Sequence, residues 1–216
     1  TAKAIDLYKK AEATGHRQGD ALFALARAAG ETGDKEEQSR AFEALQELAT
    51  QGEPSPDQAD ALYRLTELQV DSPEHRSKAI ELLKRALDQE PRYKQAASIL
   101  RRAAEADPQN TEILEVYAPV AKASNDPQIL LDFLERRAAL PGVTPDQVKE
   151  AVDLALEQEQ PERAEALYAR AVEAARESEE GLTGAVWAVL GLIGRKKVSE
   201  DLRSEEHTSE LQSLLI

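Results

Sequence analysis

Residues 60–91, DALYRLTELQVDSPEHRSKAIELLKRALDQEP, decide the fold of this chain. Apolar residues recur with the helical period on both sides of the dipeptide Ser72-Pro73, and Pro91 follows the second half. Because proline lacks a backbone N–H and fixes its own backbone angle, it marks the ends of helices rather than their middles. The stretch therefore predicts a helix, a turn and a second helix, which together form a helical hairpin.

Related helix pairs occur before and after this hairpin. The segment DALFAL at 20–25 is a near copy of DALYRL at 60–65. Gly33-Asp34 is typical of a turn, and Ser55-Pro56 and Thr144-Pro145 are typical of helix starts, where a capping side chain precedes proline. Such self-similarity indicates a repeat architecture, so we expect a stack of helical hairpins. The predicted pairs lie at 18–48, 60–91 and 143–177.

The composition favours an all-α protein. Alanine and leucine, both strong helix formers, supply most of the apolar residues, and only 4% of the chain is aromatic. No run approaches the roughly 18 consecutive apolar residues of a membrane span. The net charge of −14 argues against a nucleic-acid partner, because binding to phosphates requires a basic face.

The sequence carries no convincing catalytic or metal-binding pattern. Cysteine is absent, and the histidines His16, His75 and His207 form no His-Glu-x-x-His motif. The glycines of 181–194 lack the strand and the Lys-Ser/Thr context of a phosphate-binding loop. We therefore expect no metal, no cofactor and no enzymatic activity. The compartment stays open between the cytoplasm, which is favoured, and the periplasm.

The middle of the chain keeps helical periodicity but loses the regular spacing of the pairs. Helices are predicted at 93–106, 111–123 and 128–140. Pro119 lies inside the second of these and is expected to kink it.

Residues at set positions of the helix pairs resemble those of tetratricopeptide repeats. In its second helix this family places Ala, a large apolar residue, Ala again and then Pro at fixed spacing. The matching residues are Ala79, Leu83, Ala86 and Pro91; Ala96, Leu100, Ala103 and Pro108; and Ala164, Tyr168 and Ala171. Trp187, Leu190 and Gly191 match the first-helix pattern, whereas Gln38 and Leu45 replace small residues. The resemblance implies a right-handed superhelix of antiparallel helix pairs, a TPR-like α-solenoid similar to long bacterial repeat proteins.

The resemblance covers residues 1–202 and is degenerate at about 93–140. The chain opens inside a helical pattern without methionine, and the last pair lacks its second helix. We therefore expect an array that is truncated at both ends, a fragment of a longer protein. Residues 203–213, RSEEHTSELQS, resemble an in-frame translation of a sequencing-library adapter. We expect 203–216 to be a non-native tail.

In repeats of this family the first helices line a concave groove, and side chains at fixed positions of these helices face the ligand. The matching positions here are Asp20, Phe23, Arg27, Asp60, Tyr63, Glu67, Asp146, Lys149 and Asp153. Some members clamp a peptide carboxylate with Lys and Asn at two of these positions, and Phe23 with Arg27 and Tyr63 with Glu67 depart from that pattern. A mixed acidic and aromatic groove instead suits an extended segment with basic and apolar side chains.

The resemblance thus implies a non-catalytic protein–protein interaction scaffold that binds a peptide or protein partner in this groove. Two alternatives stay open at this point. The chain is a helical regulatory or docking region of a larger multidomain enzyme or signalling protein, or it is a self-contained enzyme. A catalytic motif in flanking sequence would favour the first alternative, and an acid–base cluster in a pocket would favour the second.

Overall fold

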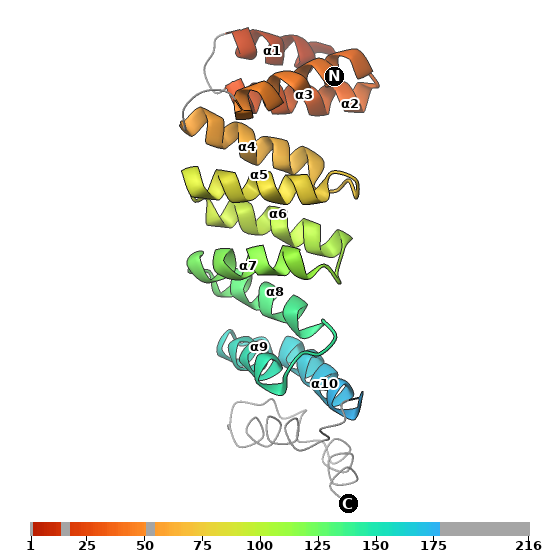
Figure 1. Cartoon of the computed structure of the whole chain (residues 1–216), viewed down its shortest axis with the longest axis vertical. Coiled ribbons are helices and arrows are strands. Elements are labelled where there is room, and N and C mark those ends of the chain that lie inside the picture. Colours follow the sequence, from red (N-terminus) through yellow and green to blue (C-terminus); the bar gives the residue numbers. More distant parts are fainter. Residues whose placement is uncertain (1, 14–17, 51–54, 178–216) are drawn as a thin grey trace, which may run out of the picture. The chain divides into compact units, whose positions relative to one another are not determined.

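The computed structural model describes residues 2–13, 18–50 and 55–177, which form ten α-helices and contain no strand. The chain divides into two compact units, 1–123 and 124–216. Within each unit every described helix packs against its neighbours in the chain (Figure 1). The predicted all-α, solenoid-like fold is confirmed.

The first unit contains seven described helices and the second unit contains three. In the first unit these are α1 (Ala2–Ala13), α2 (Gln18–Thr32), α3 (Lys35–Thr50), α4 (Pro56–Gln69), α5 (Arg76–Gln89), α6 (Tyr93–Ala106) and α7 (Thr111–Ala123). In the second unit they are α8 (Pro127–Ala138), α9 (Pro145–Glu157) and α10 (Pro161–Glu177).

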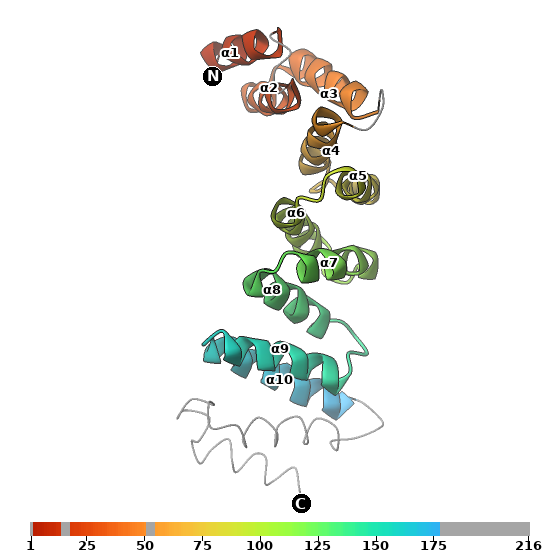
Figure 2. The ribbon, with the colours of Figure 1, turned by 90° about the vertical axis from the view of Figure 1, so that its left-hand side faces the viewer.

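Alternate helices of the first unit also touch. Helix α2 packs on α4, α4 packs on α6, and α5 packs on α7. In Figure 2, α2, α4 and α6 each lie to the left of the helix that follows them. We call α2, α4 and α6 the first helices of their pairs. Side chains of consecutive first helices therefore lie next to one another, as a stack of hairpins requires.

Helix starts follow the predicted capping signals. The Ser55 side chain accepts a hydrogen bond from the backbone N–H of Gln58 at 3.2 Å, and Pro56 takes the first helical position of α4. At the start of α9, the backbone N–H of Thr144 donates to the Gln147 side chain at 3.0 Å. These contacts satisfy N–H groups that have no partner within the helix.

The predicted Gly33-Asp34 turn joins α2 to α3. Gly33 has a φ of 76°, a left-handed conformation that costs little only for a residue without a side chain. The backbone N–H of Asp34 donates to the carbonyl oxygen of Ala29 at 2.9 Å, and the Asp34 carboxylate accepts from the N–H of Glu37 at 3.1 Å. The turn thus ends one helix and caps the next.

Buried alanines and leucines form the core between the helices. The residues that match the predicted second-helix pattern of small and large positions are fully buried, although those at 96–103 lie on α6, which packs as a first helix. Each such Leu contributes about 1.5–3 kcal/mol. The matching residues are Ala79, Leu83, Ala86, Ala96, Leu100 and Ala103 in the first unit. Leu45, which replaces a small residue, is also fully buried. In the second unit Ala164 is buried.

The middle of the chain is helical where predicted. Helices α6 and α7 have the predicted bounds, and α8 begins one residue before and ends two residues before the predicted 128–140. Helix α7 continues through Pro119 to Ala123. Pro119 and Glu115, one turn earlier, are both exposed, so water can reach the carbonyl oxygen that loses its N–H donor.

Some predictions fall on residues that the structure does not describe. The pattern at Trp187, Leu190 and Gly191 and the tail at 203–216 lie outside the described ranges. Within those ranges, no helix is both long enough and apolar enough to cross a membrane.

Candidate interaction site on the first helices

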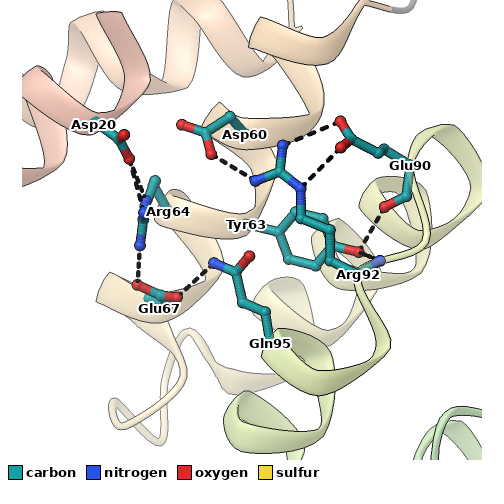
Figure 3. Close-up of polar contacts among 8 residues, drawn as sticks. All are labelled: Asp20, Asp60, Tyr63, Arg64, Glu67, Glu90, Arg92 and Gln95. Carbon is teal, nitrogen blue, oxygen red and sulfur yellow. Dashed lines mark hydrogen bonds and ion pairs between the residues drawn. The ribbon is translucent and has the colours of Figure 1, made fainter. Parts of the chain in front are cut away.

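Polar side chains of α2, α4, α6 and the turn between α5 and α6 converge in the first unit (Figure 3). We call these residues the arginine–carboxylate cluster. Its members are Asp20, Asp60, Tyr63, Arg64, Glu67, Glu90, Arg92 and Gln95. Four of them are on α4, so this helix is the centre of the cluster.

Arg64 joins α2 to α4. Its Nε and Nη2 atoms lie 2.9 and 2.7 Å from Oδ1 of Asp20, and its Nη1 lies 3.1 Å from Oε2 of Glu67. Burial alone would lower the pKa of Arg64, but the carboxylates of Glu67 and Asp20 outweigh it and raise that pKa. The guanidinium is therefore a permanent cation held between two carboxylates.

Arg92 joins α4 to the turn between α5 and α6. Its Nη1 lies 2.7 Å from Oδ1 of Asp60, and its Nε and Nη2 lie 3.2 and 3.0 Å from the two carboxylate oxygens of Glu90. The hydrogen bonds to Glu90 raise the pKa of Arg92, burial opposes them, and Asp60 raises it further. Arg92 thus repeats the arrangement of Arg64, with one cation between two carboxylates.

Tyr63 does not face a groove as predicted, because its side chain is fully buried. The hydroxyl donates to the carbonyl oxygen of Glu90 and accepts from the backbone N–H of Arg92, both at 2.9 Å. Burial raises the pKa of the Tyr63 hydroxyl, so it stays protonated and keeps both hydrogen bonds. Tyr63 therefore supports the turn and is not accessible to a partner.

Glu67 connects α4 to α6. Its Oε1 accepts a hydrogen bond from the Gln95 side chain at 2.8 Å, while its Oε2 pairs with Arg64. Its side chain is 17% exposed. The carboxylate thus joins Arg64 of its own helix to Gln95 of α6.

Phe23 and Arg27 of α2 extend the cluster. The Arg64 guanidinium lies 5.0 Å from the centre of the half-buried Phe23 ring, and that of Arg27 lies 5.8 Å from it. Arg27 is exposed and has a weak contact of 4.0 Å with Glu31. An aromatic ring with guanidinium groups near its face is a cation–π arrangement. Phe23 therefore adds an apolar surface that suits cations.

The remaining predicted residues belong to the second unit. On α9, Asp146 is exposed, and Lys149 pairs with Asp153 at 2.6 Å. The structure thus brings Asp20, Phe23, Asp60 and Glu67 into one site in the first unit. It places Asp146, Lys149 and Asp153 together on a single helix of the second unit.

Sequence reasoning missed Arg64, Glu90, Arg92 and Gln95. The predicted positions follow from the period of each first helix by itself, whereas these four residues enter the site through contacts between hairpins. The signal that existed is the proximity of Arg92 to Pro91, which places a cation at the start of α6. Nothing in the helical period indicates that Arg64 reaches back to Asp20.

Among the described residues, no group of three or more His, Cys, Asp or Glu side chains is arranged to hold a metal ion. The sequence matches no family model, and no curated protein matches it. The structure itself establishes an all-helical array in which each unit is built from helices that pack on their neighbours.

Proposed function

We propose that this chain is a tetratricopeptide-like, right-handed α-solenoid that acts as a non-catalytic protein-interaction scaffold. It binds an extended peptide or protein segment along the first helices of the first unit. The observation that carries this proposal is the arginine–carboxylate cluster, where carboxylates and the half-buried Phe23 ring lie together on consecutive first helices. Fixed charges beside an apolar surface are what an extended segment needs for orientation and affinity.

The charge of the cluster favours a basic partner. Its four carboxylates, on Asp20, Asp60, Glu67 and Glu90, share the two arginines of the cluster. The whole chain carries a net charge of −14, which also attracts cationic segments over longer distances. The partner therefore carries arginine or lysine side chains, with apolar residues between them that contact Phe23.

Binding of defined peptides to the full chain tests this proposal. The probe is a fluorescent extended peptide that repeats arginine, serine and leucine, and its counterpart carries glutamate in place of arginine. We expect the arginine peptide to bind in low salt, to weaken as salt is added and to bind better than the glutamate peptide.

The double variant Asp20→Asn/Glu67→Gln locates the binding surface. It removes two carboxylates of the cluster, and we expect it to weaken arginine-peptide binding by about tenfold. The matched control Glu43→Gln/Glu81→Gln removes two exposed carboxylates on α3 and α5 with the same change in net charge. Equal loss in both variants would show that binding depends only on overall charge and would contradict the proposed site.

A further inference from the structure

Arg64 occupies a complete binding site for a guanidinium group. Asp20 and Glu67 contact it from two helices, at 2.7 and 3.1 Å, and the Phe23 ring lies 5.0 Å from its central carbon. Two carboxylates and an aromatic ring are the groups that proteins use to bind an arginine side chain. The chain thus fills this site with its own arginine.

The aromatic ring of the Arg64 site is more accessible than the ring of the equivalent Arg92 site. The ring beneath Arg92 belongs to Tyr63, which is fully buried and hydrogen-bonded to the same turn. The ring beside Arg64 belongs to Phe23, which is half-buried on the surface of α2. A partner side chain can therefore reach the ring of the Arg64 site beside its partly exposed carboxylates, whereas the ring of the Arg92 site is closed to a partner.

We infer that Arg64 is an autoinhibitory competitor for an arginine side chain of the partner. In the free chain, the Arg64 guanidinium neutralises Asp20 and Glu67 and covers Phe23. When the partner binds, its guanidinium takes this place, and Arg64 turns outward on its long flexible side chain. This inference rests on the proposed function and adds to it that the partner residue at this position is arginine and that Arg64 limits its affinity.

Exchange of one guanidinium for another keeps the charge balance of the site. The carboxylates exchange one cation for another, so no buried charge is left without a partner. The cost of binding is the release of Arg64, and removal of Arg64 abolishes that cost. The geometry therefore predicts that a variant without the Arg64 guanidinium binds more tightly, the opposite of what loss of a binding residue causes.

The experiment measures arginine-peptide affinity for the full-length Arg64→Gln variant at fixed salt. We expect about threefold to tenfold tighter binding than in the unchanged chain, because an ion pair of this kind no longer competes. Two controls change the charge equally: Arg85→Gln on the exposed side of α5 and Arg92→Gln in the turn. Neither is expected to produce this gain. Circular dichroism establishes that each variant is folded.

A second variant links the gain to the ring. In Arg64→Gln/Phe23→Ala the gain should be lost, because the arginine of the peptide no longer has an aromatic surface. Unchanged or weaker binding of the arginine peptide to folded Arg64→Gln, or an equal gain in Arg85→Gln, overturns the inference while the proposed function stands. Failure of every folded variant and of the unchanged chain to bind the arginine peptide overturns both.

Discussion

Tyr63 holds Arg92 in two ways. Its hydroxyl oxygen accepts a hydrogen bond from the backbone N–H of Arg92 at 2.9 Å, and its ring lies 5.3 Å from the Arg92 guanidinium. The same hydroxyl donates to the carbonyl oxygen of Glu90, so one buried side chain of α4 fixes the turn that leads from α5 into α6. The position of the Arg92 cation beside Asp60 of α4 follows from this contact.

Replacement of Tyr63 by phenylalanine keeps the ring but removes both hydrogen bonds. We expect Tyr63→Phe to lower the free energy of unfolding by about 1–3 kcal/mol, because two backbone groups of the turn lose their partner. Urea unfolding measures this loss, and hydrogen exchange at the Arg92 amide should become faster. Tyr93→Phe, at a half-buried residue, is the control and should change less. Equal effects in the two variants would refute a bridging role for Tyr63.

The sequence predicts the helices well because their ends are marked locally. Proline, serine and glycine signals lie at the helix boundaries themselves, as at Ser55-Pro56 and Gly33-Asp34. Neighbouring residues are therefore enough to predict these boundaries. The packing of Ala86 and Leu83 is also predictable, because their spacing repeats in other pairs.

The site is less predictable because it forms between hairpins. Tyr63 occupies a helical position that faces the ligand in similar repeats, yet here Glu90 and Arg92 of the next turn cover it. Arg64 pairs with Asp20 although 44 positions separate them in the sequence. The periodicity of a single helix carries no information about such contacts, which depend on how one hairpin lies against the next.

Gly19 and Gly30 of α2 offer a matched pair of substitutions. A Cβ atom at Gly19 would lie 2.9 Å from Oδ2 of Asp60 and 3.3 Å from the backbone nitrogen of Ala61. We therefore expect Gly19→Ala to destabilise the chain by about 1–3 kcal/mol, because α2 and α4 must move apart.

At Gly30 the close neighbour is only the end of the flexible Gln38 side chain, which can rotate away. Gly30→Ala should stabilise the chain by about 0.5–1 kcal/mol through the higher helix propensity of alanine. Thermal unfolding of both variants measures the difference. If both substitutions raised stability or both lowered it, the result would be inconsistent with a close approach of α4 at Gly19.

Ala86 tests the packing of small residues between the helices. Its side chain is fully buried, so Ala86→Leu adds volume where none is available and should cost about 1–3 kcal/mol in the free energy of unfolding. The control Ala166→Leu adds the same side chain at an exposed position of α10 and should leave stability nearly unchanged. Chemical denaturation measures the free energy of unfolding of both variants. An Ala86→Leu variant as stable as the unchanged chain would argue against close packing at Ala86.

Glu37 makes the ion pair between α1 and α3 sensitive to acid. A hydrogen bond from Lys9 at 2.6 Å lowers the pKa of Glu37, burial opposes it, and Arg40 adds to the lowering. The unfolded chain has the usual pKa of about 4.5, so the stabilisation is complete above that pH. It is lost as the pH falls through the lower pKa of the folded state.

Stability measured by urea unfolding between neutral and acidic pH tests this effect. Glu37→Gln should be less stable than the unchanged chain at neutral pH and should lose less stability on acidification, because glutamine does not titrate in this range. Glu43→Gln, at an exposed position of α3, should keep the original pH profile. A Glu37→Gln profile that runs parallel to the original would show that the contact contributes no acid sensitivity.

The ion pairs between hairpins have a direction. On the first helices, the carboxylate comes from the earlier hairpin and the arginine from the later one, as in Asp20 with Arg64 and Asp60 with Arg92. The two aspartates occupy equivalent places in the near-copies DALFAL and DALYRL.

Between alternate odd-numbered helices of the first unit the order is reversed. Lys9 of α1 pairs with Glu37 of α3, and Lys84 of α5 pairs with Glu112 of α7, so here the cation comes first. These ion pairs therefore give the first unit an electrostatic polarity along the order of its hairpins, and the polarity has opposite signs on its two edges.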